Sequence, residues 1–170
     1  MSEKRNRPRN QSVKIKKLPG LLREVKRLRA AGASVAFTNG CFDLLHAGHL
    51  RVFREAKRWG DVLIVGVNSD ASARRLKGPS RPLVLEKERA QLLANLELVD
   101  YVIVFAEETP EDLIRAVKPD VLLKGADYKL ADIVGAEEVR GRGGKVVRVP
   151  LLAGRSTSRL TGRRLRADRR

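Results

Sequence analysis

Five short apolar runs separated by segments with helical spacing constrain the fold of this chain more than any other feature. The runs occupy residues 35–37, 62–67, 101–105, 121–123 and, interrupted by Arg148, 146–149. The run at 62–67 is apolar throughout, which is typical of a strand in a sheet covered on both faces. Because strands that alternate with helices form parallel sheets with right-handed crossovers, the pattern predicts an α/β fold. We expect a single domain with a Rossmann-like, doubly wound, parallel five-stranded sheet.

The basic residues are concentrated at the two ends of the chain. The net charge is +16, yet residues 35–154 hold eighteen basic and seventeen acidic residues. Because the excess lies outside this central part, it argues against a nucleic-acid partner and is typical of solvated extensions. We predict a basic, disordered N-terminal extension (1–17), a folded domain (18–160) that opens with an amphipathic helix (18–31), and a basic C-terminal tail (161–170).

Cysteine usage and hydropathy indicate a cytoplasmic protein. Cys41 is the only cysteine, so an internal disulfide is excluded, which suits a reducing compartment. No apolar run approaches the length that spans a bilayer, and the basic N-terminus lacks the apolar core of a secretory signal. We expect no membrane partner and no metal held by protein side chains. A homodimer is compatible with the N-terminal amphipathic helix, but no pattern decides it.

Both histidines of the chain lie in one tetrapeptide, His46-Ala47-Gly48-His49. It stands between the apolar run at 35–37 and a segment whose apolar spacing favours a helix. A helix N-terminus attracts phosphate through its unpaired N–H groups and its dipole, and Gly48 lets a ligand approach the backbone. Two imidazoles there can donate hydrogen bonds to one anion. The alternative is that both histidines are ordinary polar surface residues.

Polar or glycine-rich segments follow four of the five predicted strands. Ligands of doubly wound folds bind beyond the carboxyl ends of strands, so these segments are expected at one site. Lys124 would place an ammonium group at the sheet edge, and the hydroxyls of residues 156–158 would hold phosphate at a second helix N-terminus. Lys77 and Arg81 flank a Gly-Pro segment that suits a loop closing on phosphates. Each residue taken singly is explained as well by an ordinary loop or helix cap.

Taken together, these motifs resemble those of the nucleotidyltransferase superfamily with an HxGH signature, which includes cytidylyltransferases and sugar-phosphate adenylyltransferases. Residues 38–49 carry the superfamily signature. Further segments make residues 35–160 similar to the adenylyltransferase domains of the heptose-phosphate pathway: Val-Gly-Val-Asn-Ser-Asp-Ala-Ser, Arg-Leu-Lys-Gly-Pro-Ser-Arg-Pro, Leu-Lys-Gly-Ala-Asp-Tyr and Arg-Ser-Thr-Ser. The resemblance implies transfer of AMP from ATP to a sugar 1-phosphate, namely D-glycero-β-D-manno-heptose 1-phosphate, which yields an ADP-sugar for lipopolysaccharide and pyrophosphate.

The same resemblance implies roles for individual residues of this sequence. By this resemblance, the catalytic residues would be His46, His49, Lys77 and Lys124. The nucleotide would be bound by a larger set: Thr38, Asn39, Gly40, Phe42, Asp43, Gly48, Gly125, Asp127, Tyr128, Arg155, Ser156, Thr157 and Ser158. The acceptor would be bound by Asn68, Asp70 and Arg81. Mg²⁺ is expected to bind through the nucleotide phosphates, since the sequence offers no dedicated cage.

Some features depart from this resemblance or leave alternatives open. Bifunctional relatives carry a sugar kinase domain before this one; only 34 residues precede the first predicted strand here, so we expect a separate kinase. Ser158 stands where many relatives have threonine, and Arg159 has no obvious counterpart. The segment 151–157 lacks the leading arginine of Arg-Thr-Glu-Gly-x-Ser-Thr in cytidylyltransferases, which disfavours CTP and glycerol phosphate. A glycerol-3-phosphate cytidylyltransferase-like enzyme and a non-catalytic polyanion-binding module remain the alternatives.

Overall fold

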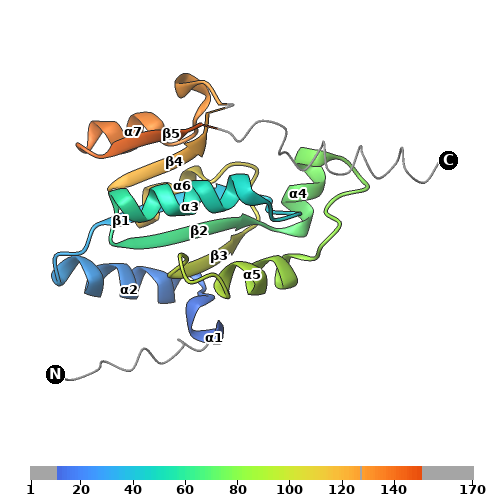
Figure 1. Ribbon diagram of the computed structural model, residues 1–170, viewed down its shortest axis with the longest axis horizontal. Coiled ribbons are helices and arrows are strands. Elements are labelled where there is room, and N and C mark those ends of the chain that lie inside the picture. Colours follow the sequence, from blue (N-terminus) through green and yellow to red (C-terminus); the bar gives the residue numbers. More distant parts are fainter. Residues whose placement is uncertain (1–10, 127, 151–170) are drawn as a thin grey trace.

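Five parallel strands form one sheet in the order β3-β2-β1-β4-β5 in the computed structural model (Figure 1). The model describes residues 11–126 and 128–150. The strands are β1 (Val35–Gly40), β2 (Val62–Asn68), β3 (Tyr101–Phe105), β4 (Val121–Gly125) and β5 (Lys145–Val149). Since β1 pairs with β2 on one side and with β4 on the other, the order of the strands reverses there. The predicted Rossmann-like, doubly wound, five-stranded parallel sheet is confirmed.

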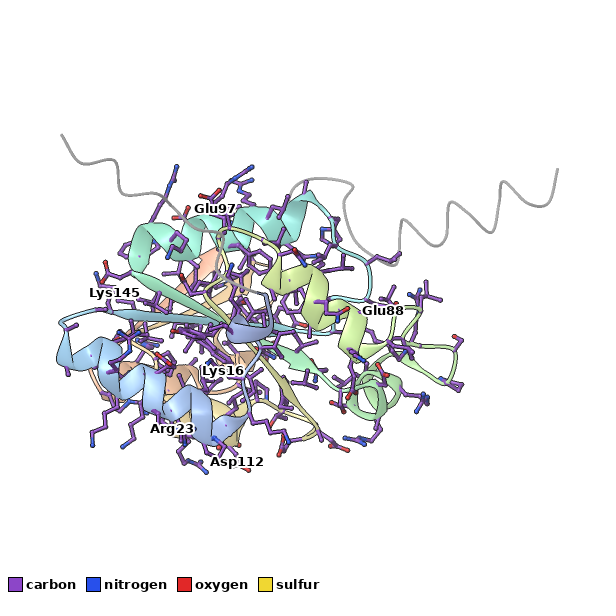
Figure 2. The ribbon with its side chains drawn as sticks, turned by 90° about the horizontal axis from the view of Figure 1, so that it is seen from below. Lys16, Arg23, Glu88, Glu97, Asp112 and Lys145 are labelled. Carbon is purple, nitrogen blue, oxygen red and sulfur yellow. The ribbon has the colours of Figure 1, made fainter. Side chains whose placement is uncertain are left out.

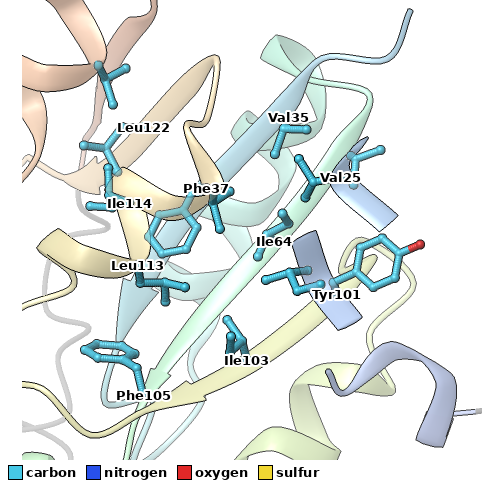
Figure 3. Packing of buried hydrophobic residues seen from close by; sticks show 14 of the residues in the cluster. Val25, Val35, Phe37, Ile64, Tyr101, Ile103, Phe105, Leu113, Ile114 and Leu122 are labelled. Atoms are coloured by element: carbon cyan, nitrogen blue, oxygen red, sulfur yellow. The ribbon is translucent and has the colours of Figure 1, made fainter. Parts of the chain in front are cut away.

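Helices cover both faces of this sheet. They are α1 (Gln11–Lys14), α2 (Leu18–Ala30), α3 (Ala47–Trp59), α4 (Asp70–Lys77), α5 (Glu86–Ala94), α6 (Glu111–Val117), the 3₁₀ helix η1 (Leu130–Asp132) and α7 (Ala136–Gly141). Buried residues of α2, α6 and α7 pack against one face (Figure 3), and those of α3 and α5 pack against the other. No helix in the described ranges is long and apolar enough to cross a membrane.

The alternation of side chains along the strands produces these two cores. Phe37 of β1 joins the cluster under α2 and α6, and its neighbour Ala36 joins the cluster under α3. On α2, Leu21 and Val25 lie four residues apart and are buried, whereas Arg23 is exposed on the outer side of the molecule (Figure 2). Helix α2 lies where the amphipathic helix is predicted.

The N-terminal segment differs from the predicted disordered extension at residues 11–17. Ile15 forms a parallel bridge with Val102 of β3, and the Lys16 N–H donates to the Val102 carbonyl at 2.9 Å. The Lys14 ammonium donates to the carbonyls of Leu96 and Val99 at 3.1 and 2.8 Å. The unpaired edge of β3 thus supplies backbone partners, which the basic composition of this segment did not reveal.

Two strands run further toward the site than the apolar pattern predicts. β1 continues beyond Phe37, because the ladder with β2 extends to the pair Gly40 and Val67. β4 likewise includes Lys124 and Gly125, which pair with β5. The polar residues predicted to lie in loops at these places, Thr38, Asn39, Gly40, Lys124 and Gly125, are therefore the last residues of strands. Their backbones are fixed by the sheet.

Candidate active site

The carboxyl ends of β1 and β4 lie side by side at the point where the strand order reverses. β1 leads into residues 41–46 and helix α3, while β4 leads toward Tyr128. In doubly wound sheets, this is the place where connections leave toward opposite faces and open a crevice for ligands. The fold therefore brings the His46–His49 segment and the Lys124 segment to one edge, as the sequence predicts.

The two histidines form a stacked pair at the start of α3. Their ring centroids are 3.8 Å apart, and the rings are inclined by 21°. His46 is the N-cap, and its Nδ1 accepts from the Gly48 N–H at 3.1 Å. Nδ1 of His49 faces the His46 N–H at a longer 3.4 Å. The pair therefore caps the helix, satisfies N–H groups that have no partner within it, and orients both rings.

These contacts determine which ring nitrogen carries the proton. A neutral imidazole has one acceptor and one donor nitrogen. Because Nδ1 accepts a backbone N–H in both rings, the proton is assigned to Nε2 in each. Burial, followed by repulsion from His46, lowers the pKa of His49 from 6.5 to about 3. At neutral pH, His49 is consequently an uncharged hydrogen-bond donor.

The Phe42 ring packs against His49 of the pair and against Phe53 of helix α3. Its ring lies 5.1 Å from the His49 ring in an edge-on arrangement and 5.7 Å from the Phe53 ring of α3. Phe42 adopts a φ of 49°, a conformation that non-glycine residues rarely take. Gly40 leaves room for this ring, since a Cβ there would lie 3.3 Å from it. Gly40 and Phe42 thus act through packing.

Lys124 is held beside the end of β1. Its ammonium donates to the carbonyl and the side-chain oxygen of Asn39 at 2.9 and 2.7 Å. The same ammonium lies 5.3 Å from the centre of the exposed Tyr128 ring. Thr38 instead donates its hydroxyl to the Leu123 carbonyl at 3.0 Å and is buried between the strands. Asn39 therefore positions Lys124, and Thr38 ties β1 to β4.

Cations surround the segment between β1 and α3. Burial raises the pKa of the Cys41 thiol, and the charges of Lys77 and Arg89 lower it; the charge of Asp43 raises it further, and that of Lys124 lowers it. This electrostatic effect requires all three cations to lie near Cys41, although they come from three different elements. Lys77 is the last residue of α4 and is exposed. Arg89 is paired with Asp70, so the charges that favour binding of an anion at this edge of the sheet are those of Lys77 and Lys124.

The carboxylate of Asp43 is engaged by the segment that connects α4 to α5. It accepts from Arg81 at 2.7 Å and from the N–H groups of Leu83 and Val84 at 2.6 and 3.1 Å. Burial raises the pKa of Asp43, but the bonds from Arg81, Val84 and Leu83 outweigh it and hold the pKa below its ordinary value. Asp43 and Arg81, predicted as ligands of two different substrates, thus bind each other.

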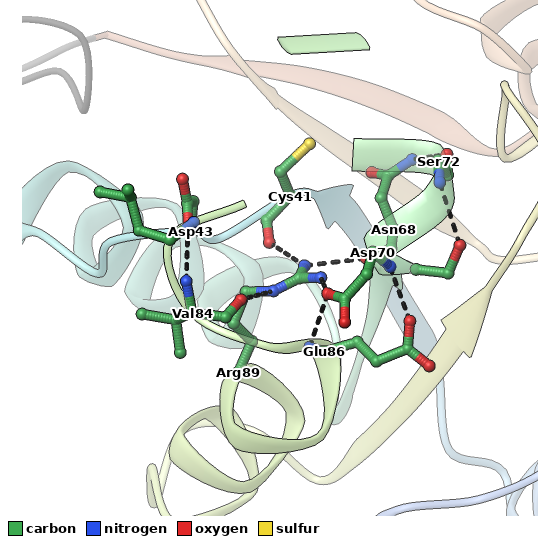
Figure 4. Close-up of polar contacts among 10 residues, drawn as sticks. Cys41, Asp43, Asn68, Asp70, Ser72, Val84, Glu86 and Arg89 are labelled. Carbon is green, nitrogen blue, oxygen red and sulfur yellow. Dashed lines mark hydrogen bonds and ion pairs between the residues drawn. The ribbon is translucent and has the colours of Figure 1, made fainter. Parts of the chain in front are cut away.

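Sequence reasoning missed Arg89, whose side chain is fully buried. Its guanidinium donates to the carbonyls of Val84, Asn68 and Cys41 and to a carboxylate oxygen of Asp70 (Figure 4). The available signal was its place four residues before Leu93 on the buried face of α5. Asn68 and Asp70, predicted to bind acceptor, therefore face this guanidinium, and the Asn68 amide also donates to Ser72 at 2.9 Å.

Some predicted ligands lie outside the residues that the structure describes. These are Asp127 and the segment with Arg155, Ser156, Thr157 and Ser158. Among the residues that are described, Gly48 is buried in the first turn of α3, and Gly125 ends β4. The structure thus brings His46, His49, Asn39 and Lys124 to one sheet edge, with Lys77 at its border.

A parallel sheet with a histidine-capped helix at its switch point is an α/β architecture suited to a phosphate-bearing ligand. The chain belongs to the cytidylyltransferase-like family, whose model matches residues 37–159. It is 50% identical over 155 residues to the bifunctional protein HldE of Geobacter metallireducens and 55% identical over 150 residues to that of Caulobacter sp. strain K31. These alignments cover 91% and 88% of this chain but only 32% and 31% of the relatives, so the chain spans about a third of their length.

Solved structures show the same fold. The lipopolysaccharide core biosynthesis protein of Thermoplasma volcanium is 30% identical, with a TM-score of 0.58 over 71% of this chain and 98% of that one. The pantoate-beta-alanine ligase of Francisella tularensis, in complex with a form of ATP and beta-alanine, has a TM-score of 0.63 at 17% identity. That likeness covers 85% of this chain and 68% of the ligase. At this identity it demonstrates a shared fold alone.

Proposed function

We propose that this protein transfers AMP from ATP to a sugar 1-phosphate, specifically D-glycero-β-D-manno-heptose 1-phosphate, and releases pyrophosphate. The observation that carries the proposal is the stacked pair of His46 and His49 at the switch point, flanked by Lys124. The segments around Lys77, Lys124 and Asn68 that resemble heptose 1-phosphate adenylyltransferases support this acceptor. The identity of about half the residues to HldE proteins supports it as well.

In this reaction, an oxygen of the sugar phosphate attacks the α-phosphorus of ATP. A new P–O bond forms as the bond to the pyrophosphate oxygen breaks, and the electron pair leaves with pyrophosphate. Because the attacking oxygen is already an anion, the step needs no general base. Catalysis is then positioning together with neutralisation of charge on the phosphates. Nε2–H groups of His46 and His49 suit this role, since they donate hydrogen bonds without requiring a change of protonation state.

The cations of the site would bind the phosphates. Lys124 is positioned by Asn39 to neutralise charge near the histidines, and the charge of Lys77 acts on Cys41 in the segment that leads to His46. The nearby carboxylates of Asp43 and Asp70 are bonded to arginines, and the part of the chain that the structure describes holds no group of His, Cys, Asp and Glu suited to a metal ion. Mg²⁺ therefore fits as an ion carried on the triphosphate, where it would supply further charge neutralisation. The nucleoside would bind near Asp127 and Tyr128, and the outer phosphates near residues 155–158.

The partners of the reaction follow from its chemistry. A sugar 1-phosphate is the product of a sugar kinase, and we propose that a kinase activity supplies it. ATP and a phosphorylated sugar are cytoplasmic metabolites, which agrees with the compartment that the sequence predicts. The homodimer stays a prediction, to be checked by measuring the mass of the protein in solution.

The test is pyrophosphate release with ATP or CTP, each combined with heptose 1-phosphate or glycerol 3-phosphate, in the presence of Mg²⁺. We expect release only with ATP and the heptose phosphate. Release with CTP and glycerol phosphate would overturn the assigned substrates while leaving the role of the histidines intact. If none of the four combinations releases pyrophosphate, the proposed reaction is wrong.

A further inference from the structure

A single buried guanidinium joins the two segments that border the candidate site. Nε of Arg89 donates to the Val84 carbonyl at 2.8 Å, and one terminal nitrogen donates to the carbonyls of Cys41 and Asn68. The other terminal nitrogen donates to Asp70 at 2.7 Å. The Arg89 side chain is 0% exposed, so it reaches its partners from inside the protein (Figure 4).

The acceptors of Arg89 belong to three places that lie apart in the sequence. Cys41 follows β1 in the segment that leads to His46, and Asn68 ends β2. Val84 lies in the segment 78–85, which connects Lys77 at the end of α4 to helix α5. Asp70 begins α4, and it also exchanges hydrogen bonds with Glu86, the first residue of α5. One side chain therefore fixes the histidine segment relative to the segment that follows Lys77.

Because Arg89 is buried, all of its hydrogen-bond partners must come from the protein. A buried charge destabilises the fold unless it is paired and hydrogen-bonded, and here one carboxylate and three carbonyls satisfy it. The planar guanidinium can donate in several directions at once, whereas a lysine ammonium is a compact point charge. Lysine at this position would retain the charge but would not reach acceptors on opposite sides. The geometry thus depends on arginine specifically.

From this geometry we infer that Arg89 is a positioning residue of the reaction: it sets the distance between the His46–His49 pair and the Lys77 side of the site. The inference rests on the proposed nucleotidyl transfer. Arg89 acts through the Cys41 and Val84 carbonyls and touches no substrate. Because misplacing reacting groups by about 1 Å can cost about 10²-fold in rate, loosening this contact affects kcat more than KM.

The first experiment measures pyrophosphate release by Arg89→Lys, with Arg115→Lys as the matched control. Arg115 also binds carboxylates, but it is 58% exposed on α6, and we expect its variant to retain wild-type kinetics. For Arg89→Lys we expect kcat to fall about 10²-fold with KM for ATP within a few-fold of wild type. Equal kcat in Arg89→Lys and wild type would overturn the inference. If wild type itself is inactive, it is the proposed function that fails.

The second experiment needs no activity. Hydrogen–deuterium exchange is compared between Arg89→Lys and wild type. We expect faster exchange confined to residues 41–46 and 78–86, with β1, β2 and helix α2 unchanged. Uniformly faster exchange would mean that Arg89 serves only overall stability, and unchanged exchange would mean that it fixes neither segment; either result overturns the inference. A third variant, Arg89→Ala, is assayed with and without millimolar guanidinium. Because guanidinium does not stabilise folded proteins, recovery of activity would show that it replaces the positioning contacts of Arg89 and does not restore folding.

Discussion

The two segments that border the candidate site differ in how much local contacts contribute to their geometry. Within residues 41–46, Phe42 and His46 are shaped by near neighbours: His46 caps its own helix, and Phe42 packs on His49 and Phe53. Cys41 and Asp43 of the same segment accept long-range bonds from Arg89 and Arg81. Residues 78–85 are held by Asp43 and Arg89, through bonds such as that from Leu83 to a residue forty positions away in the chain. The first segment combines a local motif with bonds to the buried polar network, whereas the second depends on that network.

The largest effect is expected at the histidine pair, where the local motif carries the chemistry. We predict that His46→Ala and His49→Ala each lower kcat for pyrophosphate release by about 10²–10³-fold, as loss of one preorganised donor does. The fold should persist, because the sheet does not depend on these rings. Wild-type turnover in both variants, in samples whose circular dichroism is normal, would show that the pair has no catalytic role.

The second prediction breaks the long-range network at Asp43. Asp43→Asn retains the acceptor oxygen but removes the charge that faces Arg81, in an ion pair whose carboxylate side chain is only 6% exposed. We expect the free energy of unfolding to fall by about 2 kcal/mol, which is typical for hydrogen bonds to a charged group. Urea titration measures it.

A matched control for Asp43→Asn is Asp112→Asn, which removes a 78% exposed partner of Arg115. Surface substitutions of this kind change stability by about 0.5 kcal/mol or less. Equal effects of Asp43→Asn and Asp112→Asn would mean that the Asp43 network contributes no more than a surface ion pair.

The contrast between the two segments explains what could be predicted from the sequence. The order of strands and helices, the His46–His49 helix start and the place of Lys124 follow from local patterns. The pairing of Asp43 with Arg81 could not be predicted, because each residue has a plausible separate role and only the fold brings them together. Arg89 could not be recognised as a buried arginine, because its helix segment is rich in other charged residues, which are mostly exposed. The left-handed conformation of Phe42 could not be predicted either, because phenylalanine rarely adopts it.

The third prediction uses acid to probe the histidine segment. The pKa of His49 is lowered from 6.5 to about 3 in the folded protein, so the unfolded chain binds more protons between these values. The contribution of His49 to the free energy of unfolding is therefore full above pH 6.5 and is lost as the pH falls toward 3. Between pH 7 and pH 5, His49 should account for about 2 kcal/mol of this loss. In urea unfolding at both pH values, His49→Asn should show a smaller loss than wild type; an identical loss would contradict the lowered pKa.

The smallest effect is expected at Gly40, where the local segment meets the end of β1. A Cβ at this position would lie 3.3 Å from the Phe42 ring, which is closer than most carbon contacts, so the ring must shift by a few tenths of an ångström. We predict that Gly40→Ala lowers the free energy of unfolding by about 1 kcal/mol, the lower end for overpacking. Because Phe42 supports His49, kcat should also fall by a few-fold while the Arg89 contacts are retained. A loss of stability without any change in kcat would show that the position of His49 does not depend on the Phe42 ring, and that its contact with the His46 N–H alone is sufficient to hold it.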